Sequence, residues 1–260
     1  MKIALGIEYN GTAYCGWQKQ NHSPSVQAVV EKAIAKVANH PVSVVCAGRT
    51  DTGVHALGQV VHFETDAQRS DRGWVYGANS NLPMGVSVLW AKQVKDDFHA
   101  RFSALNRRYR YVILSRNIRP AILADSVTWQ YKQLDVGKMH MAAQQLVGVH
   151  DFTSYRGVHC QAHNPQRNVM SLTVSSRDGY ICIDIKANAF LLHMVRNIAG
   201  VLMSIGAGEM PVEWALEVLE ARDRAQAGVN ASPSGLYFMG VEYPPEFSIP
   251  SEIGLGVVND

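Results

Sequence analysis

The sequence predicts an α+β fold made of two ferredoxin-like halves, residues 1–104 and 105–260. The chain is 47% hydrophobic and 18% charged, which suits a globular protein large enough to need no disulfide or metal for stability. Strand and helix patterns occur in the order βαββαβ, and this order is found twice along the chain. We expect the sheets of two such halves to meet, with a cleft between the halves.

The first half opens with a half-buried strand in which every second residue is apolar, and the Asn10-Gly11 pair ends it. Pro24 and Ser25 then begin a helix. Its apolar face consists of Val26, Val29, Val30, Ala33, Ile34 and Val37. The same patterns predict strands at 43–46, 60–63 and 86–94 and a helix at 74–79.

The second half repeats this order with one extra helix. The Asp178-Gly179 pair predicts a hairpin between two alternating strands. A polar stretch with glycine and proline, residues 153–168, is expected to be a long surface loop. The predicted elements are strands at 108–114, 172–176, 181–185 and 236–241 and helices at 136–146, 190–205 and 212–219.

Composition and cysteine usage exclude several classes of protein. The low charged fraction excludes a disordered or coiled-coil chain. The four cysteines form no CxxC pair and no signal peptide precedes them, so we expect a cytoplasmic protein. The longest apolar stretch, 189–207, contains His193, Arg196 and Asn197, which are costly in lipid, and no membrane association is expected.

A basic segment extends from Phe98 to Ala124, because it contains six arginines and no acidic residue. On a strand, Arg108 and Arg110 point to one face while Tyr109 and Tyr111 point to the other. An aromatic face edged by arginines suits nucleic acid, since bases stack on rings and guanidinium groups bind phosphate. The alternative is a solvated strand edge with its tyrosines in the core.

A second feature is the loop Gly48–Ala56, which is bounded by glycine and holds a single acid, Asp51. An ionisable residue on a loop between strands is typical of an active site, although Asp-Thr-Gly also forms ordinary β-turns. Aspartic proteases use the same triplet in pairs, but there is one copy here, and Arg49 and His55 give it a charged setting.

Two further features have competing interpretations. Arg196 lies among apolar neighbours, so it forms either a structural salt bridge or an ion pair with Asp51 in the cleft. Metal-ligand residue types occur at His150, His159, Cys160 and His163, but their spacing fits no zinc pattern, and surface histidines explain them better.

Several strings of this sequence resemble the tRNA pseudouridine synthase A family. Residues 47–56, with Gln59–Phe63 after them, resemble the signature that contains the family's aspartate. Four other segments are similar to family motifs: 9–18 to YDGTxFxGWQ, 98–111 to FxARFSAxxRxYxY, 188–197 to NAFLxxMVRN and 235–244 to the terminal strand. Asn10 stands where the family commonly has Asp, and both residues suit a turn.

The resemblance implies an isomerase that converts uridine to pseudouridine at positions 38, 39 and 40 in the anticodon arm of tRNA. It implies two ferredoxin-like halves around a continuous mixed, mostly antiparallel sheet, a homodimer, and no cofactor or metal. A non-catalytic RNA-binding or tRNA-chaperone module on the same scaffold is the alternative. The implied site residues are Asp51 as catalytic aspartate, Arg49 for base extrusion, Tyr109 and Leu236 against the two faces of the uracil, and Arg196 as the ionic partner of Asp51. Phosphate contacts are expected from Arg107, Arg108 and Arg110.

Overall fold

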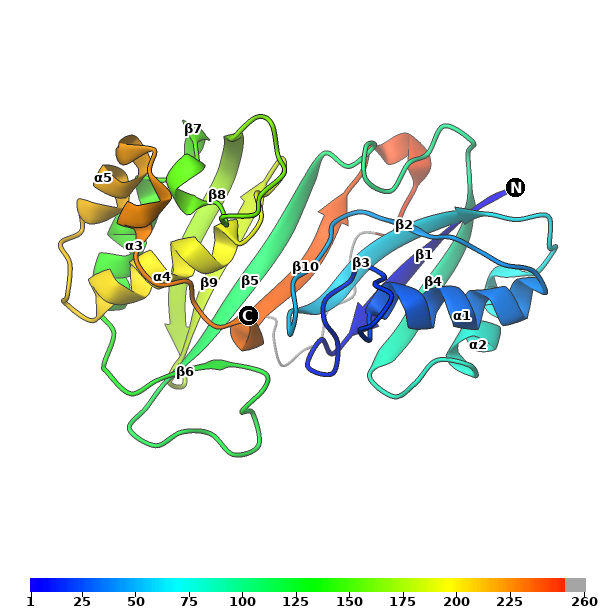
Figure 1. Ribbon diagram of the computed structural model, residues 1–260, viewed down its shortest axis with the longest axis horizontal. Helices are drawn as coiled ribbons and strands as arrows, with labels where there is room; N and C mark the ends of the chain where they lie inside the picture. The colour runs from blue at the N-terminus through cyan, green and yellow to red at the C-terminus, as the bar shows by residue number, and fades with distance from the viewer. Residues whose placement is uncertain (251–260) are drawn as a thin grey trace. The chain divides into compact units, whose positions relative to one another are not determined.

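The computed structural model describes residues 1–250. These residues form ten strands and five α-helices, so the predicted α+β class is confirmed. The chain divides into two compact units (Figure 1). The first contains Met1–Arg107 together with the segment that begins at Tyr237, and the second contains Arg108–Leu236.

The first unit has the predicted βαββαβ order and gains a strand from the end of the chain. Its strand order is β4-β1-β3-β10, and β2 pairs with β3. β1 is antiparallel to both β3 and β4, whereas β10 is parallel to β3. The elements are β1 (Lys2–Tyr9), α1 (Val26–Ala38), β2 (Val45–Cys46), β3 (His55–Glu64), α2 (Asp71–Asn79), β4 (Val86–Val94) and β10 (Leu236–Glu242).

β10 marks the main difference from the predicted halves, which placed residues 236–241 in the second. Tyr237 and Phe238 pair with His55 and Ala56 of β3. The Tyr237 ring also stacks on His55, with 4.8 Å between ring centroids. Sequence patterns identify β10 as a strand but not its partner, because the pairing joins residues at opposite ends of the chain.

Helix α1 uses the face that its sequence pattern predicts. Val26, Val30 and Ile34 are fully buried, and the helix packs against α2 (Figure 1). The two helices approach closely at Gly77, where a Cβ atom would lie 2.9 Å from a methyl group of Val37. Glycine therefore permits this helix crossing.

The second unit has strand order β5-β9-β8-β7, and β6 pairs with β5. Helix α3 packs against β8 and α4, and α5 packs against α3 and α4 (Figure 1). The short strands β6 and β7 were not expected, because β6 has only three residues, TWQ, and the four of β7, GVHD, do not alternate between apolar and polar. The elements are β5 (Asn106–Ser115), β6 (Thr128–Gln130), α3 (Val136–Gln144), β7 (Gly148–Asp151), β8 (Gln166–Arg177), β9 (Tyr180–Ala187), α4 (Met194–Gly206) and α5 (Trp214–Ala221).

The stretch 153–168 is only partly the surface loop that its composition predicts. It begins with a 3-10 turn, η1 (Thr153–Tyr155), in which Ser154 and Tyr155 are fully buried. The Tyr155 hydroxyl donates to the carbonyl of Ala215 at 2.9 Å. The prediction is wrong for this turn, because a polar segment can satisfy its hydrogen bonds inside the protein as well as in water.

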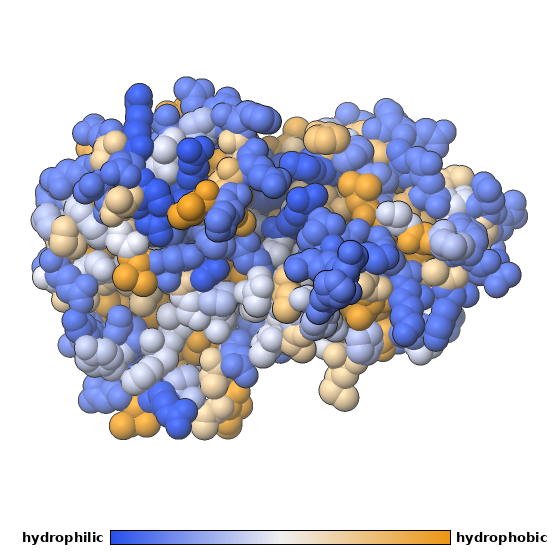
Figure 2. Space-filling model, viewed as in Figure 1, coloured by the Kyte–Doolittle hydropathy of each residue, from blue (hydrophilic) through white to orange (hydrophobic). Residues whose placement is uncertain are grey.

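The surface is mostly hydrophilic on the face that Figure 2 shows, with apolar residues at the tip of the loop between β5 and β6. In that loop Ile118 and Ile122 are 75% and 97% exposed. Among residues 1–250, none of the helices combines the length and hydrophobicity needed to cross a membrane.

A buried histidine of β3 makes the first unit sensitive to pH. His62 is 6% exposed, and its Nδ1 accepts the backbone N–H of Ala100 at 3.1 Å. Burial, and to a lesser degree the neighbouring His99 and Lys2, lowers the pKa of His62 to about 4. Folding therefore favours the neutral ring.

We predict that the free energy of unfolding falls as the pH decreases from about 6.5 towards 4, because the unfolded chain then binds a proton that folded His62 does not. Urea unfolding at pH 7.5 and pH 5.0 measures this loss. His62→Asn keeps an acceptor for Ala100 but does not titrate, so the variant should lose less stability than the wild type, by on the order of 1 kcal/mol. His22→Asn, at an exposed position, is the control and should lose as much as the wild type; equal losses in all three proteins would contradict the prediction.

Candidate catalytic site

Asp51 lies on a tight turn between β2 and β3. The N–H of Val54 donates to the carbonyl of Asp51 at 3.1 Å, which closes a four-residue turn. Gly53, the third residue of the turn, has φ of +77°, a backbone conformation that residues with a side chain rarely adopt. The turn interpretation of Asp-Thr-Gly is therefore correct, and the turn holds the half-buried Asp51 at a fixed place.

The segment after β1 supports one side of this turn. The backbone N–H of Trp17 donates to the carbonyl of Thr50 at 3.0 Å. The buried hydroxyls of Tyr9 and Thr50 lie 2.7 Å apart. At Gly16, a Cβ atom would lie 2.7 Å from the carbonyl oxygen of Thr50. The two backbones thus approach too closely for a side chain at this position.

The same segment also fixes the end of the turn. The N–H of Gly11 donates to Nδ1 of His55 at 3.1 Å, so the neutral His55 ring carries its proton on Nε2. A Cβ atom at Gly11 would collide with the carbonyl of Val54, at 2.0 Å. Gly53 donates to the carbonyl of Tyr14 at 3.3 Å. The catalytic candidate therefore sits on a loop held from both ends.

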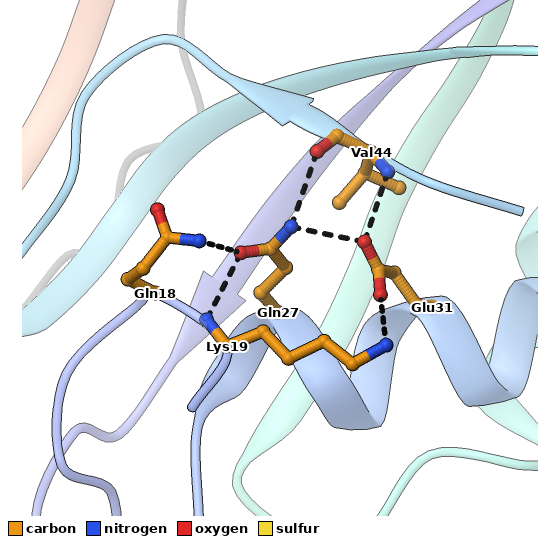
Figure 3. A network of polar contacts seen from close by, with 5 residues as sticks. All are labelled: Gln18, Lys19, Gln27, Glu31 and Val44. Atoms are coloured by element: carbon orange, nitrogen blue, oxygen red, sulfur yellow. Dashed lines mark hydrogen bonds and ion pairs between the residues drawn. The ribbon is translucent and has the colours of Figure 1, made fainter. Parts of the chain in front are cut away.

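A buried polar network continues this support into α1 (Figure 3). Glu31 is 7% exposed, and its carboxylate accepts from Lys19 Nζ at 3.0 Å and from the N–H of Val44 at 3.2 Å. Gln27 Oε1 accepts from Gln18 and from the N–H of Lys19, both at 3.0 Å. The network joins the end of the supporting segment to the chain that leads into β2.

Arg107 supports the other end of the loop. Its Nη2 donates to the carbonyl of Ala47 at 3.2 Å and also to the carbonyl of Arg101. Gln59, in β3, donates to the carbonyl of Gly48 at 2.6 Å. The guanidinium of Arg107 thus binds two backbone carbonyls, one of them directly before the Asp51 loop, and its phosphate contact stays a prediction.

In the second unit, β5 shows the alternation that the sequence predicts, but its tyrosines lie in the core. Tyr111 is fully buried, and its hydroxyl donates to the carbonyl of Ser232 at 2.8 Å. Tyr109 is 8% exposed and meets Phe190 edge to face at 4.9 Å. Both tyrosines are thus buried, as the second interpretation of this stretch expects, and a role for the stretch in binding nucleic acid stays a prediction.

The arginines of β5 have different surroundings. Arg110 forms a two-point ion pair with Asp184 of β9, at 2.7 and 3.1 Å. A carboxylate therefore already binds the Arg110 guanidinium, and the phosphate contact expected of Arg110 stays a prediction. Half-buried Arg108 forms no hydrogen bond or ion pair with any residue in the described part of the chain.

Arg196 lies in the first turn of α4, which begins at Met194 and not at 190 as predicted. Its Nε donates to the carbonyl of Ala231 at 2.8 Å. Burial raises the pKa of Tyr111, and the charge of Arg196 acts in the opposite direction. Leu236 is 5% exposed and begins β10 directly after the 3-10 turn η3 (Pro233–Gly235).

Comparison with known proteins decides the family. The family model described as tRNA pseudouridine synthase matches residues 6–103 and 142–244, which is most of the chain. The chain belongs to the tRNA pseudouridine synthase family. It is 58% identical over 250 residues to tRNA pseudouridine synthase A of Pseudomonas aeruginosa, which covers 96% of this chain and 88% of that protein. The tRNA pseudouridine synthase A of Coxiella burnetii is 55% identical over 249 residues, covering 96% and 95%.

The family resemblance expected from sequence is thus confirmed, and its motifs gain a physical meaning. The string at residues 9–18 supports the Asp51 turn through Gly11, Gly16 and Trp17. Asn10, where the family commonly has Asp, accepts the N–H of Thr12 at 3.0 Å, so it forms the turn that an aspartate would form.

Both compact units of this tRNA pseudouridine synthase family member carry predicted site residues. Arg49, Asp51 and Arg107 belong to the first unit, and the others, Arg108, Tyr109, Arg110, Arg196 and Leu236, belong to the second. Sequence reasoning missed Tyr9, Thr50 and Gln59 as positioning residues, although all three lie within the strings that resemble the family. Among residues 1–250, no three His, Cys, Asp or Glu side chains gather as metal ligands.

Proposed function

We propose that this protein isomerises uridine to pseudouridine in the anticodon arm of tRNA, at positions 38, 39 and 40. The observation that carries the proposal is membership of the family, together with an aspartate on a rigid, glycine-dependent turn at the family's motif. The reaction breaks the C1′–N1 bond of uridine, forms a C1′–C5 bond, and moves a hydrogen from C5 to N1 in net terms. Nothing is oxidised or reduced, so the proposed chemistry needs no redox cofactor.

Asp51 has two chemical routes open to it. Its carboxylate either attacks the nucleotide and forms a covalent intermediate, or stabilises positive charge that develops on the sugar. In both routes Arg196 pairs with this carboxylate, while Tyr109 and Leu236 hold the detached uracil. The Tyr109 hydroxyl is the candidate to take up the C5 proton. Arg49, which is exposed beside Asp51, assists extrusion of the base.

The competing function is a tRNA-binding or chaperone module that performs no chemistry. It would use the same basic segment and would not need Asp51. Family membership favours the synthase, because the relatives matched over 96% of this chain are named as synthases.

We expect Asp51→Ala to lower tritium release from tRNA labelled at uracil C5 by at least about a thousandfold, because C5 must lose its hydrogen for pseudouridine to form. Affinity for tRNA should change by no more than a few fold. Thr52→Ala, an exposed position on the same turn, is the matched control and should release tritium at the wild-type rate. Normal release by Asp51→Ala would refute the catalytic role, and no release by the wild type, with tight binding, would support the binding module.

The same assay tests the ion pair. Arg196→Ala should lower the rate at saturating tRNA more than it lowers affinity. Combined with Asp51→Ala, it should cause little further loss, since residues that act as a unit are not additive. A loss of affinity alone would separate Arg196 from Asp51.

Arg108 is our proposed phosphate contact in β5, since Arg110 is held by Asp184. We expect Arg108→Ala to flatten the plot of log Kd for tRNA against log salt by about 0.7–0.9. Arg110→Ala, on the same face of the same strand, should leave that slope unchanged. The measurement is a binding series from 50 to 200 mM salt; an unchanged slope in Arg108→Ala would place that side chain away from phosphate.

We also propose that the protein acts in the cytoplasm as a homodimer, as the family resemblance implies. The exposed Ile118 and Ile122 support a protein contact at the loop between β5 and β6 (Figure 2). Sedimentation equilibrium should give about twice the chain mass of 28.6 kDa. Ile118→Asp combined with Ile122→Asp should shift the protein towards monomer, whereas Val158→Asp, at another exposed apolar position, should not. A monomeric wild type would overturn the proposal.

A further inference from the structure

An aromatic side chain is exposed to solvent on the segment that links β4 to β5. Phe102 is 75% exposed, although phenylalanine is usually buried. Its ring stacks on the His99 ring, with centroids 4.3 Å apart and planes inclined by 29°. The guanidinium carbon of Arg101 lies 5.6 Å from the centre of the same ring. The three side chains, His99, Arg101 and Phe102, form what we term the Phe102 platform.

The Phe102 platform is rigid, because its backbone is fixed on both sides. Ala100 is fully buried, donates to His62 and accepts from the Tyr243 hydroxyl at 2.7 Å. Nδ1 of His99 accepts the backbone N–H groups of Arg101 and Phe102, at 3.2 and 3.1 Å. These bonds fix the His99 ring plane and, with it, the direction in which Phe102 is presented.

His99 contributes a flat and neutral ring to the platform. Burial lowers its pKa, and the charges of Lys2 and Arg101 act in the same direction. Acceptance of two N–H groups by Nδ1 likewise requires that this nitrogen carry no proton. The stack of His99 and Phe102 is therefore a preformed aromatic surface.

The platform is connected to the Asp51 loop within the first unit. Arg107 donates to the carbonyls of both Arg101 and Ala47, so it joins the platform to the start of that loop. Burial raises the pKa of the Cys46 thiol, and the charges of Arg49 and Arg101 both oppose that rise.

We propose that the Phe102 platform binds an unpaired base of the RNA substrate next to the target uridine, with the base stacked on Phe102 and the adjoining phosphate on Arg101. The inference rests on the proposed function and extends it by a second binding position on the same strand. Base stacking on aromatic rings together with arginine contacts to phosphate is the usual way in which proteins hold single-stranded RNA.

Charge favours RNA over a protein partner at this surface. From Phe98 to Ala124 the sequence has no acidic residue. A protein partner centred on Phe102 would have to bring its own carboxylate to pair with the Arg101 guanidinium, because this segment has no acid to offer. A phosphodiester supplies the negative charge together with a flat base.

The test is the dissociation constant of unmodified tRNA, measured by filter binding. Phe102→Ala should weaken binding by roughly five- to 150-fold, the range found when a base loses an aromatic partner. Phe102→Leu keeps an apolar side chain without a π face and should be weakened in the same way. Phe102→Trp should bind as tightly as the wild type, and its additional indole emission should be quenched by tRNA. Leu105→Ala, an apolar position that is 52% exposed, is the matched control and should bind normally.

Two results would overturn the inference. One is wild-type affinity in both Phe102→Ala and Phe102→Leu; the other is a weakened variant that also sediments as a monomer where the wild type is a dimer, since Phe102 would then contact protein. Binding is read without turnover, so the two proposals can fail separately. If the wild type releases tritium but the Phe102 variants bind tRNA as tightly as the wild type, only the platform is refuted. If tRNA binding depends on Phe102 but the wild type releases no tritium, only the isomerisation is refuted.

Discussion

The close approach of two backbone segments at Gly11 and Gly16 is the constraint on which the Asp51 loop depends. No side chain fits at either position, because the carbonyl oxygens of Val54 and Thr50 occupy the space. The approach in turn allows Trp17 to donate to Thr50 and the Tyr9 and Thr50 hydroxyls to meet in the interior. A carboxylate held in this way loses little freedom when substrate binds, which is what a preorganised catalytic group requires.

Much of the fold follows from local patterns. The first six elements of the first unit, from β1 to β4, and the α1 core face were predictable, since each depends on residues a few positions apart. The strand β6 is too short to show a pattern, and β7 has no alternation of apolar and polar residues from which to predict it. α4 begins four residues later than predicted because His193 adopts a left-handed conformation, with φ of +61°, and interrupts an otherwise helical apolar run. The placement of β10 depends on its pairing with β3, which no local pattern encodes.

The residues of the candidate site could be predicted where they stand in family motifs. They were harder to predict where their role depends on a partner far away in the sequence. Asp51 and Arg196 stand in strings that resemble the family. The arginines of the basic segment look equivalent in sequence, yet Arg110 meets an acid 74 residues away and Arg107 binds the carbonyl of a residue 60 positions away. Composition therefore indicates a basic surface. Only the tertiary structure distinguishes Arg107 and Arg110, which bind other parts of the protein, from Arg108, which binds none of the described residues through its side chain.

The return of β10 to the first unit has a consequence for how this protein is made. His55, at the end of the Asp51 turn, stacks on Tyr237, a residue that leaves the ribosome only after the entire second unit has been synthesised. Contacts of such long sequence separation form late, because a large loop of chain must first be closed. A nascent chain therefore has most of the strands and helices described here before it has a complete setting for Asp51, and β10 completes the surroundings of a turn made near the beginning.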